Sequence, residues 1–129
     1  MILADSSIWI DFFNDTNNEK VDALVEYLSR ERVISADLVI TEVLQGFRKD
    51  SDFLTAVEIF KTIPCHSVAG IEIALKSAEN FRSLRKKGIT IRKTVDMILA
   101  TYCIENNISL LQNDRDFEMI ASELDLILL

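Results

Sequence analysis

Acidic side chains stand where they could share one site. Asp5 directly follows the apolar run 1–4, and Asp114 follows a second short apolar run after two polar residues. If both runs are strands of a parallel sheet, their carboxyl ends meet at one edge, where ligands bind in open α/β sheets. Asp96 falls in the first turn of an expected helix whose amino end belongs to the same edge. Glu42 lies at the border of an apolar stripe, where an unpaired carboxylate is costly.

Convergence of these carboxylates implies a divalent cation. Like charges held close together repel and raise each other's pKa, and a bound cation removes that repulsion. Oxygen ligands without a nearby His or Cys favour Mg²⁺ or Mn²⁺ over zinc or copper. Each acid also has a structural interpretation: Asp5 as a helix cap, Asp96 at the positive end of a helix dipole, Asp114 or Asp116 in a turn, and Glu42 in an ion pair.

Basic residues are concentrated in one strip. The chain has 14 bases and 21 acids, a net charge of −7, which is the opposite of the excess typical of nucleic-acid-binding domains. The segment 82–93 nevertheless holds six bases and no acid. They are Arg82, Arg85, Lys86, Lys87, Arg92 and Lys93. Such a strip is either a solvated surface or a contact for a phosphate backbone, for which Arg85, Arg92 and Lys93 are the candidate residues.

The elements that must position these residues alternate between short apolar runs and amphipathic segments. Strands are expected at 1–4, 33–35, 65–68, 108–111 and 126–129. Helices are expected at 8–13, 19–31, 36–47, 51–62, from 71 to a stop at Gly88, from an N-cap at Thr94 to Tyr102, and at 117–124. This alternation predicts an α/β sandwich around a parallel sheet.

Length and composition limit the organisation of the chain. At 129 residues, with 3 Gly and 1 Pro, it is expected to form one helix-rich domain over 1–129. Cys65 and Cys103 are far apart and without metal-ligand spacing, so both are expected to be reduced core residues. The N-terminus lacks a basic leader, and no 18 apolar residues run together, so we expect a cytosolic protein without a membrane contact.

Four segments together resemble the PIN-domain family. They are Leu3 to Ile10 (LADSSIWI), Glu42 to Gly46 (EVLQG), Gly88 to Ala100 (GITIRKTVDMILA) and Leu110 to Phe117 (LLQNDRDF). Their order and spacing match across essentially the whole chain, and the length is similar to that of VapC-type toxins. The resemblance implies a three-layer α/β/α sandwich with a short, mainly parallel sheet flanked by helices.

The resemblance also implies an activity and a site. It implies a metal-dependent endoribonuclease, the toxin of a type II toxin–antitoxin pair, using Mg²⁺ with Mn²⁺ as a substitute. The acids that match the family's catalytic and metal-binding positions are Asp5, Glu42, Asp96 and Asp114, with Asp116 a rival for the last place. Ser7 matches a small hydroxyl residue near the metal and is also a candidate substrate-binding residue. Asn113 matches a polar neighbour, whereas Gln112 departs from the Thr that relatives often have.

The implied partners are RNA, an antitoxin and a second copy of the chain. An open ribonuclease site in the cell needs an inhibitor, which we expect to lay an amphipathic helix near 21–28 and 39–47 and to place a basic residue, an Arg, on the carboxylates. The apolar content of 49% exceeds what one small core readily buries, and the excess indicates a homodimer, a groove for the antitoxin, or both.

Three other classes fit the chain less well. A phospho-acceptor receiver domain needs paired acids after the first strand, and a phosphatase of the DxD type needs a second Asp, but Ser6 and Ser7 follow Asp5. A non-catalytic binding protein with the same fold is the third alternative. The single histidine, His66, is interpreted as a structural or surface residue.

Overall fold

A four-stranded parallel sheet forms the centre of the protein in the computed structural model, which describes residues 1–129. The strands are β1 (Ile2–Ala4), β2 (Val33–Ala36), β3 (Cys65–His66) and β4 (Ser109–Leu111), in the spatial order β3-β2-β1-β4. In the register, Leu3 of β1 lies beside Ile34 on one side and Leu110 on the other. Residues of β1 and β2 are buried throughout, which is why β1 is a continuous apolar run and Ser35 is the one polar residue of β2.

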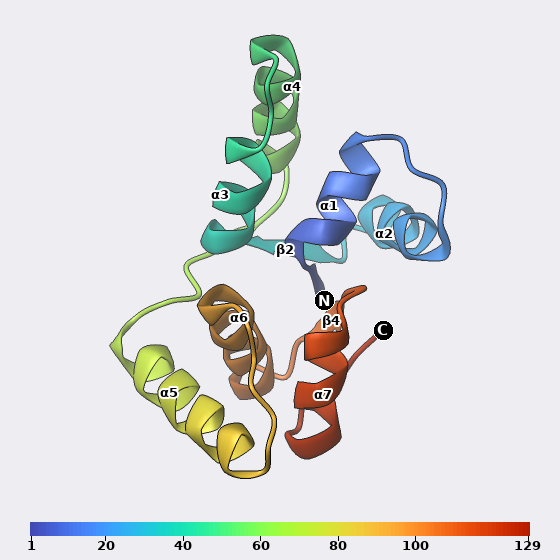
Figure 1. The fold of residues 1–129 in the computed structure, drawn as a ribbon. Coiled ribbons are helices and arrows are strands. Elements are labelled where there is room, and N and C mark those ends of the chain that lie inside the picture. Colours follow the sequence, from blue (N-terminus) through green and yellow to red (C-terminus); the bar gives the residue numbers. More distant parts are fainter.

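Seven helices cover the sheet in two layers (Figure 1). One layer contains α1 (Ser6–Phe13), α2 (Glu19–Ser29), α3 (Asp37–Gln45) and α4 (Asp50–Lys61). The other contains α5 (Ile71–Lys86), α6 (Thr94–Glu105) and α7 (Arg115–Glu123). The chain order explains this division, because right-handed crossovers from β1 to β2 and β3 use one face and the return to β4 uses the other. The predicted three-layer α/β/α sandwich is confirmed.

The core joins the sheet to both helical layers through 25 buried apolar residues. Trp9 is fully buried on α1, and its ring lies 4.9 Å from that of Phe60 on α4 and 6.1 Å from that of Phe13. On the other face, Met97 and Leu99 of α6 and Phe117 of α7 are buried. α1 and α6, which carry Asp5 and Asp96 at their amino ends, are therefore packed into the core and hold these carboxylates in place.

Several local predictions are wrong. Lys93, not Thr94, is the N-cap of α6, and it makes no side-chain capping bond. The segment 126–129 is not a strand, because it pairs with the sheet only through a bridge between Leu128 and Leu110. Cys103 is buried as expected, but Cys65 is exposed, since it lies on the edge strand β3.

The apolar stripe of α5 points largely away from the core. Ile71 and Leu75 are 79% and 62% exposed, so the helix that their spacing predicted exists but presents them to solvent. No helix of the structure is both long enough and apolar enough to span a membrane.

Candidate active site

Asp5 lies at the carboxyl end of β1 and begins α1. Its side chain caps the helix, with Oδ1 accepting hydrogen bonds from the Ile8 amide (3.2 Å) and the Ser7 hydroxyl (2.7 Å). Burial raises the pKa of Asp5, the Ser7 and Ile8 bonds oppose this, and the charge of Asp114 raises it further. Asp5 therefore caps α1, as its interpretation as a helix cap predicted. It is also a neighbour of a second carboxylate, that of Asp114.

Asp96 lies in the first turn of α6 and is the most perturbed of these acids. Its pKa is raised from 3.8 to about 6, mainly by burial, and nearby Lys93 opposes this increase. The carboxylates of Asp114, Glu42 and Asp5 contribute to the same increase. Glu42 comes from α3 in the opposite helical layer, so the structure brings acids from both layers to one edge of the sheet. We call Asp5, Glu42, Asp96 and Asp114 the acid cluster.

Asp114 and Asp116 have different surroundings although they are two residues apart. Asp114 caps α7, and its Oδ1 accepts a hydrogen bond from the Asp116 amide (2.8 Å). Asp116 is buried and accepts hydrogen bonds from the main chain (3.2 Å) and Nε (3.1 Å) of Arg92. Of the two, Asp114 is the one among the main causes that raise the pKa of Asp5 and Asp96. The acid cluster thus includes Asp114, and Asp116 lies against Arg92.

The basic strip is divided by the fold. Lys93 stands at the start of α6 close enough to Asp96 to lower its pKa. Arg85, near the end of α5, is exposed and lies over the Phe81 ring, 5.6 Å from its centre. Lys87 forms a 3.0 Å ion pair with Glu123 of α7. Only one end of the strip therefore reaches the acid cluster.

Two residues that were not identified as functional from the sequence shape the surroundings of the site. Gln112 is buried, and its side-chain oxygen accepts a hydrogen bond from the Asp114 amide, which gives this departure from Thr a role in the turn. Asp37, which follows β2 and begins α3, accepts hydrogen bonds from the amides of Leu38 and Val68 and so links the start of α3 to the segment after β3. A short polar residue after an apolar run was the available signal for Asp37. Asn113 is exposed.

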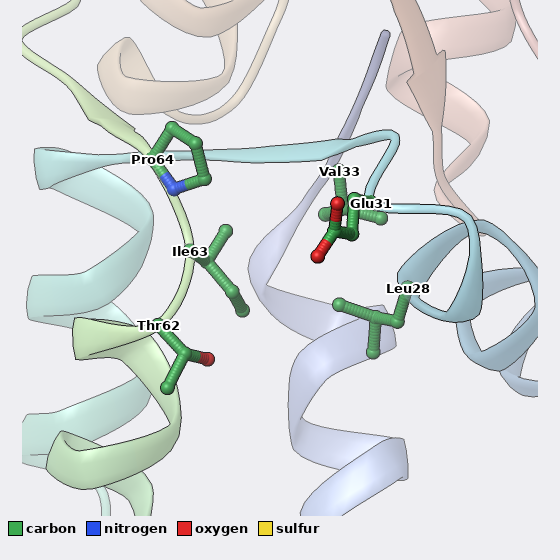
Figure 2. Close-up of a pocket in the computed structure, with 6 residues that line it drawn as sticks. All are labelled: Leu28, Glu31, Val33, Thr62, Ile63 and Pro64. Atoms are coloured by element: carbon green, nitrogen blue, oxygen red, sulfur yellow. The ribbon is translucent and has the colours of Figure 1, made fainter.

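The largest cavity lies at the other end of the sheet. About 470 Å³ in volume, it is lined by residues that precede β2 and β3, together with Val33 at the start of β2 (Figure 2). In Figure 2, Leu28 and Ile63 extend toward each other across it, with Glu31 and Pro64 at its border. Because it opens at the amino ends of the strands, it is separate from the acid cluster.

The donor set of the acid cluster fits a hard divalent cation. Its members are all carboxylates, and their mutual repulsion is the kind that a cation relieves. Their side chains do not yet surround one point, since no three His, Cys, Asp or Glu residues are arranged as a metal site. The fold and the cluster together define an α/β domain with an acidic centre at the carboxyl edge of a parallel sheet.

The chain belongs to the PIN-domain family, whose model matches residues 2–123. The family membership predicted from the sequence is thus confirmed. Two relatives, VapC ribonuclease Mb1587 of Mycobacterium bovis and ribonuclease VapC11 of Mycobacterium tuberculosis, are each 27% identical over 123 residues, covering 94% of this chain and 92% of the relative.

Solved structures show the same fold. The VapBC2 complex from Rickettsia felis, bound to a DNA fragment from the VapBC2 promoter, gives a TM-score of 0.79 at 20% identity, over 100% of this chain and 98% of that chain. DNA-bound VapBC from Salmonella typhimurium gives 0.79 at 16% identity with the same coverage. VapC20 from Mycobacterium tuberculosis, a toxin that cleaves the sarcin-ricin loop, gives 0.68 at 14% identity, over 96% of each chain.

Proposed function

We propose that this protein is the toxin of a type II toxin–antitoxin pair and an Mg²⁺-dependent endoribonuclease. The observation that carries the proposal is the electrostatic coupling of the acid cluster, in which three carboxylates raise the pKa of Asp96 within a PIN domain. The names of the relatives, ribonucleases of the VapC type, support the choice of RNA as substrate.

The acid cluster would hold one or two Mg²⁺ ions, with Mn²⁺ as a substitute. A bound divalent cation supplies an activated water and neutralises charge on the phosphate oxygens. Asp5 is oriented for this role by the Ser7 hydroxyl and the Ile8 amide, which both occupy Oδ1. Ser7 therefore supports the site by holding a ligand, and no covalent nucleophile is needed.

Basic residues beside the acid cluster would contact the RNA backbone. Lys93 is the nearest to Asp96, and Arg85 extends the positive surface along α5. Arg92 is exposed as well, but its guanidinium bonds Asp114. Contacts of this kind to phosphates act on any sequence, so they would bind RNA without selecting the cleavage site.

An antitoxin would cover the apolar surface between α1 and α3. A cavity of about 180 Å³ there is lined by Ile10, Phe13, Val43 and Phe47 among others, and exposed Val25 on neighbouring α2 adds to the apolar surface. Similar structures come from VapBC complexes and other toxin–antitoxin pairs, which supports this partner. The exposed Ile71 and Leu75 on α5 support the proposed homodimer.

The test is cleavage of a defined single-stranded RNA by the purified protein, with Asp96→Asn as the inactive variant. Asp22→Asn is the matched control, because Asp22 also lies in the first turn of a helix but is exposed and outside the acid cluster. We expect cleavage with Mg²⁺ or Mn²⁺ by the wild type and the control, and none in EDTA or with Asp96→Asn. Cleavage that persists in EDTA, or in Asp96→Asn, would refute the metal-dependent mechanism.

The toxin role has its own test in cells. Expression of the chain alone should arrest growth, and co-expression with the adjacent open reading frame should restore it. Asp96→Asn should be harmless without the neighbour. A wild-type protein that is harmless alone and binds no neighbouring gene product contradicts the toxin assignment.

A further inference from the structure

Arg92 connects the two acids at the start of α7. It lies in the loop between α5 and α6, and both its main-chain N–H (3.2 Å) and its Nε (3.1 Å) donate hydrogen bonds to Oδ2 of Asp116. Its Nη2 donates to Oδ1 of Asp114 at 3.3 Å. One side chain thus bonds both carboxylates at once, which a guanidinium can do because its donors are fixed in a planar fork.

Asp116 is committed to this contact. Its side chain is 4% exposed, whereas that of Arg92 is 70% exposed. A buried carboxylate is stable only when it is paired and hydrogen-bonded, and Arg92 supplies every side-chain hydrogen bond that Asp116 receives. Asp114, and not Asp116, is among the main causes that raise the pKa of Asp5 and Asp96.

The bonds to Asp114 leave only one of its oxygens free. Oδ1 accepts from both the Asp116 amide (2.8 Å) and Nη2 of Arg92 (3.3 Å), while Oδ2 accepts no hydrogen bond. Gln112 holds the Asp114 amide from the other side. The carboxylate is therefore held by two hydrogen bonds to Oδ1 and its main chain by a third, and Oδ2 is the remaining acceptor.

We propose that Arg92 and Asp116 form a positioning pair for Asp114. Asp116 anchors the Arg92 guanidinium, and Arg92 holds Oδ1 of Asp114 so that Oδ2 remains free for the cation. This inference rests on the proposed function, because it takes Asp114 as a metal ligand. It gives Asp116 and Arg92 the role of supporting that ligand. Neither residue then binds the metal, and contact with RNA is not their main role.

Two variants and one control test the pair. Arg92→Lys keeps the charge but loses the fork, and because the Arg92 side chain is mostly exposed, this variant should fold normally. Asp116→Asn removes the anchoring charge in nearly the same volume. Arg85→Lys is the control, because it is the same substitution in the same basic strip. Unlike Arg92, Arg85 forms no ion pair with a carboxylate in the structure and lies over the Phe81 ring.

The readouts separate metal binding from RNA binding. Mn²⁺ binding is measured by electron paramagnetic resonance without RNA, and binding of a fluorescent single-stranded RNA is measured in EDTA. We expect Arg92→Lys and Asp116→Asn each to weaken Mn²⁺ binding about tenfold, as outer partners of metal ligands do. We expect the double variant to be no weaker than either single one, because the two residues act as a unit. RNA binding in EDTA should change less than about twofold, and Arg85→Lys should leave Mn²⁺ binding unchanged.

The other outcomes overturn the inference in distinguishable ways. If Arg92→Lys binds Mn²⁺ like the wild type but binds RNA more weakly, Arg92 is only a phosphate contact. If Asp116→Asn loses Mn²⁺ and Arg92→Lys does not, Asp116 is itself a ligand. If the wild type binds no Mn²⁺, the proposed metal dependence fails, and the positioning role fails with it.

Discussion

Replacing Asp96 with Asn should stabilise the metal-free protein at neutral pH. Burial and the neighbouring carboxylates raise the pKa of Asp96 from 3.8 to about 6. At about 1.4 kcal/mol for each tenfold change in acid strength, ionised Asp96 costs the folded state about 3 kcal/mol. Asn also loses the favourable interaction of a carboxylate with the amino end of α6, about 0.5 kcal/mol. The net gain for Asp96→Asn is then about 2.5 kcal/mol, and solvent screening at this partly exposed side chain reduces it to about 2 kcal/mol, which corresponds to roughly 6–10 °C in Tm for a domain of this size.

The pH dependence gives the sign of this effect. Below pH 3.8 the carboxyl is protonated in both the folded and the unfolded chain, so Asp96 has no electrostatic cost. Between pH 3.8 and about 6 the unfolded chain ionises first, and the stability contributed by Asp96 therefore falls as the pH rises. Above about pH 6 the full cost is present. The advantage of Asp96→Asn should accordingly be largest at pH 7 and absent near pH 4.

Urea unfolding in EDTA, followed by the fluorescence of the single and fully buried Trp9, measures this difference between pH 4 and 7.5. Asp22→Asn is the control, and it should lose about 0.5 kcal/mol at neutral pH because it removes only a helix-end interaction. The reasoning is refuted if Asp96→Asn is no more stable than the wild type at pH 7, or if its advantage is the same at pH 4 and pH 7.

Further predictions concern the cap, the basic strip and the thiols. Asp5→Asn should be about 1 kcal/mol more stable than Asp5→Ala in thermal melts, because only Asn retains the capping oxygen of α1; equal stability would deny the capping role. Neutralising Lys93 and Arg85 together should reduce the salt dependence of single-stranded RNA binding by roughly 0.7 per lost phosphate contact, and an unchanged slope would make the strip ordinary surface. In the folded protein one thiol, that of Cys65, should react with an aromatic disulfide, since burial raises the pKa of Cys103 to about 12; rapid labelling of two thiols would contradict this.

The sequence predicts the sheet well because burial on both faces leaves a distinct pattern. The runs at β1, β2 and β4 are short, mostly apolar and followed by polar residues, so both their location and their direction can be inferred. The run 126–129 has the same composition but alternates in exposure, with Leu126 buried and Ile127 and Leu129 exposed. Composition alone cannot distinguish a buried strand from a terminal segment that forms a single bridge with the sheet.

The sequence predicts the site residues that the sheet topology positions, but not those whose surroundings depend on the conformation of a loop. Asp5 and Asp114 follow strands, so their shared edge follows from topology alone. The choice between Asp114 and Asp116 does not, because both begin α7 and only the loop carrying Arg92 separates their environments. The exposure of Ile71 on α5 could not be predicted either, because the spacing of apolar residues indicates a helix but not whether that face is buried.

Three of the four acids lie at helix amino ends. Asp5 and Asp114 cap α1 and α7, and Asp96 lies in the first turn of α6, so the parallel topology directs the positive ends of these helices at the acid cluster. Each such end contributes typically 0.3–1 kcal/mol, which is less than the roughly 3 kcal/mol that ionised Asp96 costs. The fold therefore reduces the repulsion without removing it, and a cation should stabilise the protein measurably.

Mn²⁺ should thus raise the Tm of the wild type in a pH-dependent way. A ligand present at 100 times its Kd stabilises the folded state by about 2.7 kcal/mol, or roughly 8–13 °C here. Binding needs ionised carboxylates, so the Tm increase should be large at pH 7.5 and decline as the pH falls through the pKa of Asp96, about 6. Asp22→Asn should retain the increase, whereas Asp96→Asn should lose most of it. An equal increase in Asp96→Asn, or one independent of pH between 5 and 7.5, would place the bound ion elsewhere on this acidic protein.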